Sequence, residues 1–179
     1  MDYLRWGVLG ASKFALEHLT PAIQLAKNNR FIALASSSKE KSAEFVMLEP
    51  EIKLYESYNE LLADDGIDAV YIPLPNTMHV DWTVQAIKSG KHVLCEKPIA
   101  MRAEEINELI KLRDDTGLLV AEAYMIVHHP QWQKAREIVQ SGILGELIQV
   151  DSVFSYNNQA DTENIRNNSK MGGGGLPDI

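Results

Sequence analysis

Residues 5–15 read Arg-Trp-Gly-Val-Leu-Gly-Ala-Ser-Lys-Phe-Ala, a short apolar run that leads directly into a turn of small residues. The apolar run predicts a strand, and the turn takes the place of a G-x-G-x-x-G phosphate-binding loop, here changed to G-x-S-x-x-A. Gly10 can make the tight turn, Ser12 is small enough for backbone N–H groups to approach a pyrophosphate, and Ala15 permits close helix–strand packing. Taken alone, this pattern fits an ordinary strand-to-helix turn equally well.

The chain that follows alternates short β-branched runs with longer helical patterns. The runs are continuously apolar, as in strands that are covered on both faces. We predict strands at Arg5–Leu9, Phe31–Ala35, Lys53–Tyr55, Ala69–Leu74, His92–Cys95 and Leu118–Ala123. We predict helices that open at Thr20–Pro21 and at the capping box beginning with Ser57, and helices over Val80–Ser89 and Ala103–Thr116. This alternation predicts an α/β fold of Rossmann type, with a doubly wound parallel sheet.

The pattern changes after Tyr124. One more helix is expected over Pro130–Gln140, then a strand over Leu147–Tyr156 with alternating apolar and polar residues, then a polar loop and a glycine run at residues 172–175. We therefore expect an NAD(P)-binding domain over residues 1–124, and over residues 125–179 the truncated beginning of a C-terminal α+β domain for substrate binding and oligomerisation. The unpaired edge and exposed apolar face of that strand lead us to expect that the chain forms a homo-oligomer or that the segment after Leu144 is partly disordered.

Composition excludes several classes of protein. The chain has 179 residues and a formal net charge of −8, which argues against general nucleic-acid binding because phosphate backbones attract basic faces. It contains no apolar run long enough for a membrane span, and its N-terminus shows no signal peptide, so we expect a cytoplasmic protein that binds no membrane. The single cysteine, Cys95, follows Val93 and Leu94 and is expected to be a buried strand thiol.

The end of the second predicted strand bears on cofactor choice. NAD-binding sites usually place Asp or Glu about 20 residues past the glycines, where it holds the ribose 2′-hydroxyl. Here Ser36-Ser-Ser-Lys39 stands at this point, with no acid before Glu40. Hydroxyls followed by a lysine suit a 2′-phosphate better, so we favour NADP, with NAD possible. The alternative is a solvated turn that caps the next helix.

The segment Glu96-Lys97-Pro98 ends the fifth predicted strand. In a doubly wound sheet the carboxyl ends of the strands face the ligand crevice. A lysine there can donate a hydrogen bond to a substrate oxygen and favour its anionic form as hydride leaves or arrives. The alternative is a structural salt bridge between Glu96 and a neighbour.

Several ordered motifs together resemble the glucose-fructose oxidoreductase/inositol dehydrogenase (Gfo/Idh/MocA) family. They are Gly90–Pro98, Ala69–His79, Glu122–Met125 with His129-Pro130, Asn164–Arg166 and Gly172–Asp178. The branch most resembled contains dihydrodiol dehydrogenase, D-xylose dehydrogenase and glucose-fructose oxidoreductase. The resemblance spans the whole chain and implies hydride transfer between nicotinamide and the carbon of a small-molecule sugar, polyol or cyclic alcohol.

The resemblance also implies roles for single residues. Lys97 matches the family's catalytic lysine, and Asp178 matches the aspartate of a D-x-x-x-(His/Tyr) motif whose last member is the acid/base and whose place lies beyond Ile179. The turn and the resemblance together predict these cofactor contacts: Gly10, Ala11, Ser12, Lys13, Phe14, Ser36, Ser37, Lys39, Pro73, Leu74, Asn76, His79, Glu96 and Lys97. No metal site is expected, because adjacent histidines such as His128-His129 point apart.

The leading hypothesis is thus part of an NAD(P)-dependent dehydrogenase or reductase, a fragment expected to be inactive alone. A non-catalytic NAD(P)-binding regulator of the same fold is the alternative, and the presence of both Lys97 and Asp178 argues for the enzyme. An S-adenosylmethionine-binding domain would share the sheet but would not explain Glu96-Lys97-Pro98.

Overall fold

The computed structural model of the chain describes residues 3–157, 159–161 and 164–174. These residues form two compact units. The first contains the chain up to Ala123 together with the described residues from Ile165 onward, and the second is Tyr124–Asn164. The two units are described separately below, and the division into domains at residue 124 stays a prediction.

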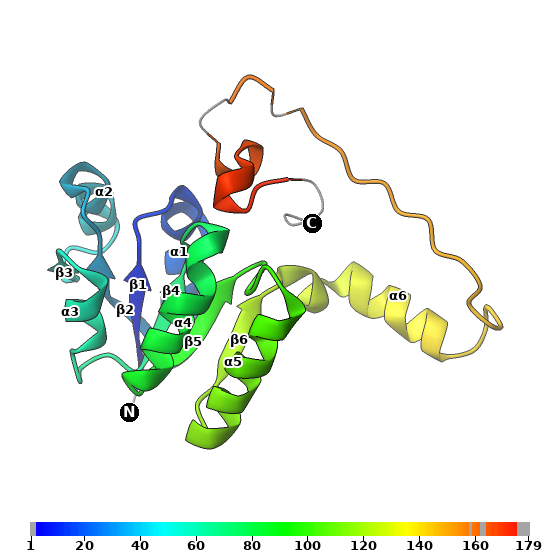
Figure 1. Ribbon diagram of the computed structural model, residues 1–179, viewed down its shortest axis with the longest axis horizontal. Coiled ribbons are helices and arrows are strands. Elements are labelled where there is room, and N and C mark those ends of the chain that lie inside the picture. Colours follow the sequence, from blue (N-terminus) through cyan, green and yellow to red (C-terminus); the bar gives the residue numbers. More distant parts are fainter. Residues whose placement is uncertain (1–2, 158, 162–163, 175–179) are drawn as a thin grey trace. The chain divides into compact units, whose positions relative to one another are not determined.

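The first unit is built on one parallel sheet of six strands (Figure 1). The strands are β1 (Leu4–Leu9), β2 (Asn29–Ala35), β3 (Lys53–Tyr55), β4 (Ala69–Ile72), β5 (His92–Glu96) and β6 (Val120–Ala123). Their order is β3-β2-β1-β4-β5-β6, with every neighbouring pair parallel. All six predicted strands and the doubly wound Rossmann fold are confirmed. The chain reverses its winding direction between β1 and β4, which are adjacent in the sheet.

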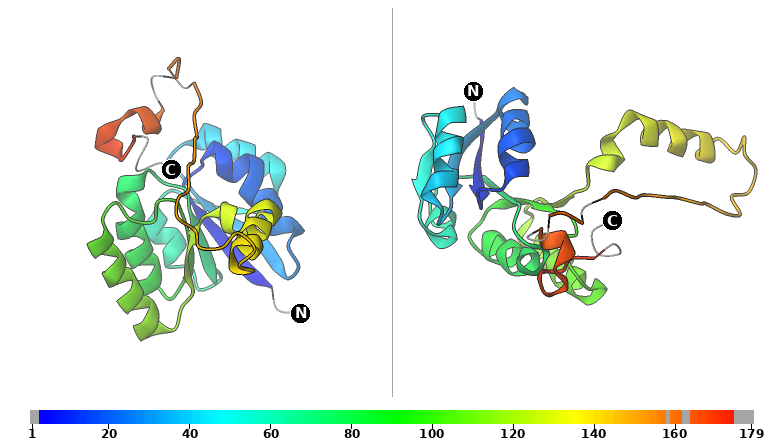
Figure 2. Two further views of the ribbon diagram at one scale, coloured as in Figure 1. Left: turned by 90° about the vertical axis from the view of Figure 1, so that its right-hand side faces the viewer. Right: turned by 90° about the horizontal axis from the view of Figure 1, so that it is seen from above.

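Helices cover both faces of this sheet, as Figures 1 and 2 show. They are the π-helical turn η1 (Ala15–Leu19), α1 (Thr20–Leu25), α2 (Lys39–Leu48), α3 (Tyr58–Leu62), the 3-10 turn η2 (Asn76–Met78), α4 (His79–Lys88) and α5 (Ala103–Thr116). One core packs α3 and α4 against Leu9, Val70 and Ile72, and the other packs α1 and α2 against Val8 and Tyr71. Successive residues of β1 and of β4 therefore enter opposite cores, which is why these central strands are almost entirely apolar.

The first helix begins earlier than its sequence predicts. Helical backbone starts at Lys13 rather than at Thr20. The N-cap is Ser12, whose Oγ accepts a hydrogen bond from the backbone N–H of Ala15 at 3.0 Å. Thr20 lies inside the helical segment, and its hydroxyl donates to the carbonyl of Ala15 at 3.0 Å. The cap prediction at Thr20 was wrong because Ser12 fills the capping role and the chain stays helical through Pro21.

The second unit contains the 3-10 turn η3 (Met125–His128) and α6 (Pro130–Gln140), the latter confirming the predicted helix. The strand predicted over Leu147–Tyr156 is absent: this described segment has no regular secondary structure. A strand requires hydrogen bonds from a neighbouring strand, and no described residue pairs with this segment. Alternation of apolar residues was therefore not sufficient to make it a strand.

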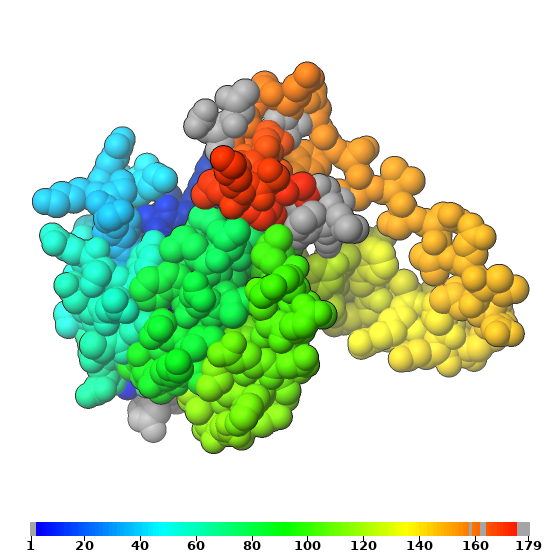
Figure 3. All heavy atoms as spheres, in the orientation of Figure 1, coloured from blue at the N-terminus to red at the C-terminus, as the bar shows by residue number. Residues whose placement is uncertain are grey.

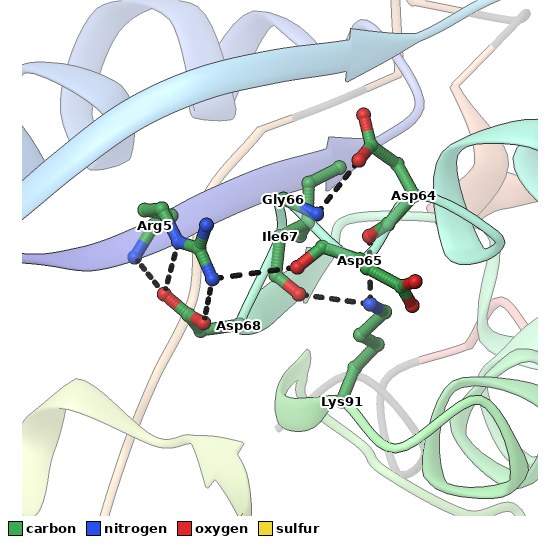
Figure 4. Close-up of polar contacts among 7 residues, drawn as sticks. All are labelled: Arg5, Asp64, Asp65, Gly66, Ile67, Asp68 and Lys91. Atoms are coloured by element: carbon green, nitrogen blue, oxygen red, sulfur yellow. Dashed lines mark hydrogen bonds and ion pairs between the residues drawn. The ribbon is translucent and has the colours of Figure 1, made fainter.

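Two buried or half-buried cations hold the amino-terminal edge of the sheet (Figure 4). Arg5 at the start of β1 donates to both carboxylate oxygens of Asp68, at 2.8 and 2.6 Å. Lys91, which is 4% exposed, donates to the backbone carbonyls of Asp64 and Ile67, each at 2.8 Å. The loop before β4 is thus tied to the residue before β5.

Within the described part of the chain, no helix is both long and apolar enough to cross a membrane.

We expect Lys91→Met to destabilise the first unit by about 2–3 kcal/mol. Methionine keeps the apolar stem but leaves the buried carbonyl of Ile67 and the partly buried carbonyl of Asp64 without their charged donor. The comparison variant is Lys88→Met on the exposed surface of α4, which is expected to change stability by less than about 0.5 kcal/mol. Urea denaturation of both variants measures the difference, and equal midpoints would contradict the role given to Lys91.

Candidate functional site

Most of the predicted site residues lie at the carboxyl edge of the sheet. Gly10 follows β1, Ser36 follows β2, Pro73 follows β4, and Lys97 follows β5. β1 and β4 are neighbours at the point where the winding of the chain reverses, and this is the place at which sheets of this kind bind nucleotides. The chain therefore brings together residues that are far apart in sequence.

The turn after β1 is shaped for a close approach. Gly10 has φ +104°, and a Cβ at this position would lie only 2.8 Å from Leu74 Cδ2. Ser12 caps the helix, so Ala15 N–H is occupied, whereas no acceptor in the described chain is recorded for the N–H groups of Lys13 and Phe14. These two amide donors stand at a helix N-terminus, the position at which backbone N–H groups bind phosphate in other proteins.

The segment after β2 presents hydroxyls and a lysine. Ser36 Oγ accepts from the N–H of Ser38 at 3.1 Å, and Ser38 Oγ caps α2 by accepting from Lys41 N–H. The side chains of Ser37 and Lys39 are exposed. Ser38 therefore caps the next helix, as the alternative interpretation expected. The exposed side chains of Ser37 and Lys39 are accessible to a ligand.

The loop after β4 contains Asn76, which is joined to a distant segment. Its side-chain Nδ2 donates to the carbonyl of Gly172 at 3.0 Å. Gly172 is buried at φ +79°, and a Cβ there would lie 2.9 Å from Asn76 Cβ and 3.1 Å from Met101 Sδ. In Figure 3 this segment rests on the residues that follow β4 and β5. Gly172 is therefore part of a close-packed contact with Asn76 and Met101.

The charged pair after β5 has a buried support. Tyr71 of β4, which is fully buried, donates its hydroxyl to Glu96 Oε1 at 2.5 Å, and Glu96 Oε2 accepts from the backbone N–H of Lys97 at 3.3 Å. Burial, followed by the charge of Glu96 and its hydrogen bond, raises the pKa of Tyr71 far above its usual range, so the phenol stays protonated. Tyr71 was missed from sequence, although it supplies the only polar side-chain atom within β4.

His79 is placed differently from the other predicted contacts. It begins α4, its side chain is 0% exposed, and both ring nitrogens meet backbone carbonyls. Nδ1 lies 2.7 Å from Pro98 O, and Nε2 lies 2.7 Å from Leu74 O. The ring therefore lies beneath the two loops, and its predicted contact with a cofactor stays a prediction.

The remaining predicted residues divide as follows. Asp178 lies outside the described residues, so its role stays a prediction. Cys95 is confirmed as a buried strand thiol, and burial raises its pKa to about 12. His129 caps α6 by accepting from Gln131 N–H. Among residues 3–157, 159–161 and 164–174, no cluster of three or more His, Cys, Asp or Glu side chains could hold a metal ion.

The residues of the site, considered without any comparison to other proteins, fit a dinucleotide. The Gly10 turn has no room for a side chain, the amides of Lys13 and Phe14 have no acceptor among the described residues, and the exposed residues Ser37 and Lys39 follow the neighbouring strand β2. These are donors and a cation arranged for a pyrophosphate and a ribose.

Comparison with known proteins identifies one family model. The model GFO_IDH_MocA, described as an oxidoreductase family with an NAD-binding Rossmann fold, matches residues 4–124.

Similar sequences cover the whole chain. An uncharacterized oxidoreductase from Rhizobium meliloti is 42% identical over 179 residues, which are 100% of this chain and 53% of that protein. D-xylose 1-dehydrogenase (NADP(+)) 2 from Haloferax volcanii is 37% identical over 98% of this chain and 54% of its own length. The chain thus spans about half the length of the curated relatives it matches.

A solved structure shows the same fold. It is a 3-ketoreductase from Actinomadura kijaniata in complex with NADP and TDP-benzene, with a TM-score of 0.75 and 32% sequence identity. The match covers 81% of this chain and 44% of that chain.

We expect Gly172→Ala to break the contact between Asn76 and the segment around Gly172. The new Cβ would meet Asn76 Cβ at 2.9 Å and would force a left-handed backbone on alanine. The matched control is Gly117→Ala, which has φ +69° but no neighbour within 4 Å, and so tests only the backbone cost of about 1–2 kcal/mol. The NMR signals of the Asn76 side-chain amide should move in Gly172→Ala alone. An unchanged Asn76 amide in that variant would show that the contact does not depend on glycine.

Proposed function

Because this chain belongs to the GFO_IDH_MocA family of oxidoreductases with an NAD-binding Rossmann fold, we propose that it is the cofactor-binding half of an NADP(H)-dependent sugar dehydrogenase or reductase. The observation that carries the proposal is the meeting of the Gly10 turn, Asn76 and Lys97 at one edge of the sheet. An S-adenosylmethionine-binding domain would give no use to Lys97, and family membership favours the oxidoreductase.

In the proposed complex, the cofactor pyrophosphate receives hydrogen bonds from the N–H groups of Lys13 and Phe14. Ser37 and Lys39 bind the ribose 2′-phosphate, for which a hydroxyl donor and a positive charge are suitable and a carboxylate is not. The names of similar proteins support this choice, since one relative is NADP(+)-dependent and one similar structure contains NADP.

When bound, the nicotinamide supplies or accepts the hydride. The residues of this chain contribute electrostatic stabilisation to the reaction. Lys97 donates a hydrogen bond to the oxygen on the reacting carbon and stabilises negative charge as it develops there. Glu96, held by Tyr71, fixes the strand end from which Lys97 extends, because its carboxylate also accepts from the Lys97 backbone N–H. We assign proton transfer to and from the substrate oxygen to the last member of the D-x-x-x-(His/Tyr) motif, four residues after Asp178.

The proposed substrate is a sugar or a related polyol. One relative is named as a D-xylose dehydrogenase and is 37% identical to this chain. Another is named as a reductase of a dTDP-linked keto sugar and is 36% identical. The chain's own residues do not choose among these, and we propose that the second half of the protein does so, together with subunit association.

We expect the chain to bind NADP(H) more tightly than NAD(H). The test variant Ser37→Asp puts a carboxylate beside the proposed 2′-phosphate and is expected to weaken NADP(H) binding by about 1.4–2.8 kcal/mol, roughly 10- to 100-fold. Ser37→Ala is the matched control, because it removes the hydroxyl without adding charge and should cost only a few-fold. Calorimetric titration with both cofactors measures the effect. Equal or tighter NAD(H) binding by the unmodified chain would rule out the preference.

We expect residues 1–179 alone to bind cofactor without turning over substrate, because proton transfer and substrate positioning depend on residues beyond them. In the complete protein, Lys97→Ala should leave the cofactor Kd nearly unchanged and lower kcat by about 10²–10⁴-fold. Lys88→Ala on the exposed surface of α4 is the control and should keep full activity. A fully active Lys97→Ala enzyme would place the chemistry elsewhere, and a complete protein that binds NADP(H) without any turnover would support the regulator instead.

A further inference from the structure

Tyr58 is a partly buried side chain at the start of α3, and it is not among the cofactor contacts predicted from the sequence. Its hydroxyl oxygen would lie 3.6 Å from a Cβ on Gly10, so it stands beside the turn that is proposed to bind the pyrophosphate. The side chain of Leu74, after β4, borders the same Cβ position at 2.8 Å. The glycine turn therefore has one apolar and one hydroxyl-bearing neighbour.

The hydroxyl of Tyr58 is open to a ligand. No described residue forms a hydrogen bond with it, and its oxygen is not one of the fully enclosed polar atoms that lack a partner. Solvent therefore reaches this oxygen. Burial of the ring raises the pKa of Tyr58, which keeps the hydroxyl protonated and able to donate a hydrogen bond at neutral pH.

The ring that bears this hydroxyl is held by its neighbours. Trp82 of α4 packs edge to face against Tyr58, with the ring centroids 4.8 Å apart and the planes at 89°. Both rings pack against the buried core between the helices and the sheet. Ser57 caps α3 by accepting from the backbone N–H of Glu60 at 3.2 Å, which fixes the backbone beside Tyr58. A hydroxyl on a ring held in this way loses little conformational entropy when it binds a ligand.

The place of β3 in the sheet indicates which half of a dinucleotide Tyr58 reaches. β3 lies next to β2, and the backbone N–H of Ser36 donates to the carbonyl of Tyr55 at 3.1 Å. Tyr58 follows β3 by three residues. It thus comes from the half of the sheet that also bears Ser37 and Lys39, the residues proposed to bind the 2′-phosphate. The adenosine half of the cofactor is the half that this arrangement favours.

We propose that Tyr58 is a cofactor-binding residue whose hydroxyl donates a hydrogen bond to the phosphate on the adenosine side of the NADP(H) pyrophosphate. A phosphate oxygen only accepts, and a hydrogen bond to a charged acceptor is stronger than one between neutral groups. The inference rests on the proposed function, because it requires a dinucleotide at the Gly10 turn.

Two tyrosine-to-phenylalanine substitutions test the proposal. Tyr58→Phe removes a hydroxyl that has no partner among the described residues, so we expect an unchanged urea midpoint and a Kd for NADP(H) that rises about three- to tenfold. Tyr55→Phe is the matched control, because the Tyr55 hydroxyl donates to Asp64 within the protein. The control should lower the urea midpoint and leave the Kd for NADP(H) within about twofold.

Calorimetric titration of the 179-residue chain with three probes identifies the group that is bound. Tyr58→Phe should weaken the binding of NADP(H) and of adenosine 2′,5′-bisphosphate, which retains the phosphate, by similar factors. Adenosine 2′-monophosphate lacks that phosphate, so its affinity should stay unchanged.

An unchanged Kd for NADP(H) in Tyr58→Phe would overturn the proposal, since a ring that serves only the core predicts that result. A loss confined to NADP(H), or an equal loss for all three probes, would also overturn it, because the contact would then lie away from the phosphate. Absence of NADP(H) binding by the unmodified chain contradicts the proposed function itself. The two hypotheses therefore fail in different measurements.

Discussion

Burial of the central strands on both faces is the constraint on which the rest of the first unit depends. Val8 and Leu9 of β1, and Val70 and Tyr71 of β4, are each 0% exposed. Strands enclosed in this way have little room for polar function along their length, because an unpaired buried polar group is costly. The polar groups are therefore concentrated at the strand ends, and parallel pairing brings all the carboxyl ends to the same edge. The location of the site follows from the packing of the core.

Three buried polar side chains each contact a polar group whose position the fold determines. Lys91 donates to two backbone carbonyls at the amino-terminal edge, and the His79 ring meets two carbonyls at the opposite edge. Tyr71 donates to Glu96. In each case a side chain that would be expensive to bury unpaired instead ties one loop to another. The amino-terminal connections stabilise the sheet, and the carboxyl-terminal ones hold the loops that bear Asn76 and Lys97.

The errors in the sequence-based predictions have physical causes. The predicted cap at Thr20 rests on a Thr-Pro pair that is typical of helix starts, but Ser12 satisfies the first turn and the helix continues through that pair. The predicted strand over Leu147–Tyr156 rests on alternation alone. Alternation describes how side chains would be sorted between two faces, whereas a strand exists only when a neighbour accepts and donates its backbone hydrogen bonds. No described residue does so for this segment.

The amino-acid sequence by itself determined the elements whose signal is local. The six strands, α5 and α6, the Gly10 turn and the place of Lys97 after β5 can be predicted from runs of neighbouring residues. Only the tertiary structure decided which groups meet: Tyr71 with Glu96 across 25 residues, His79 with Pro98 across 19, and Asn76 with Gly172 across 96. The physical reason is that periodicity and propensity act within a few residues of the chain. A hydrogen bond between loops depends instead on strand order, and that order is set by how the whole core packs.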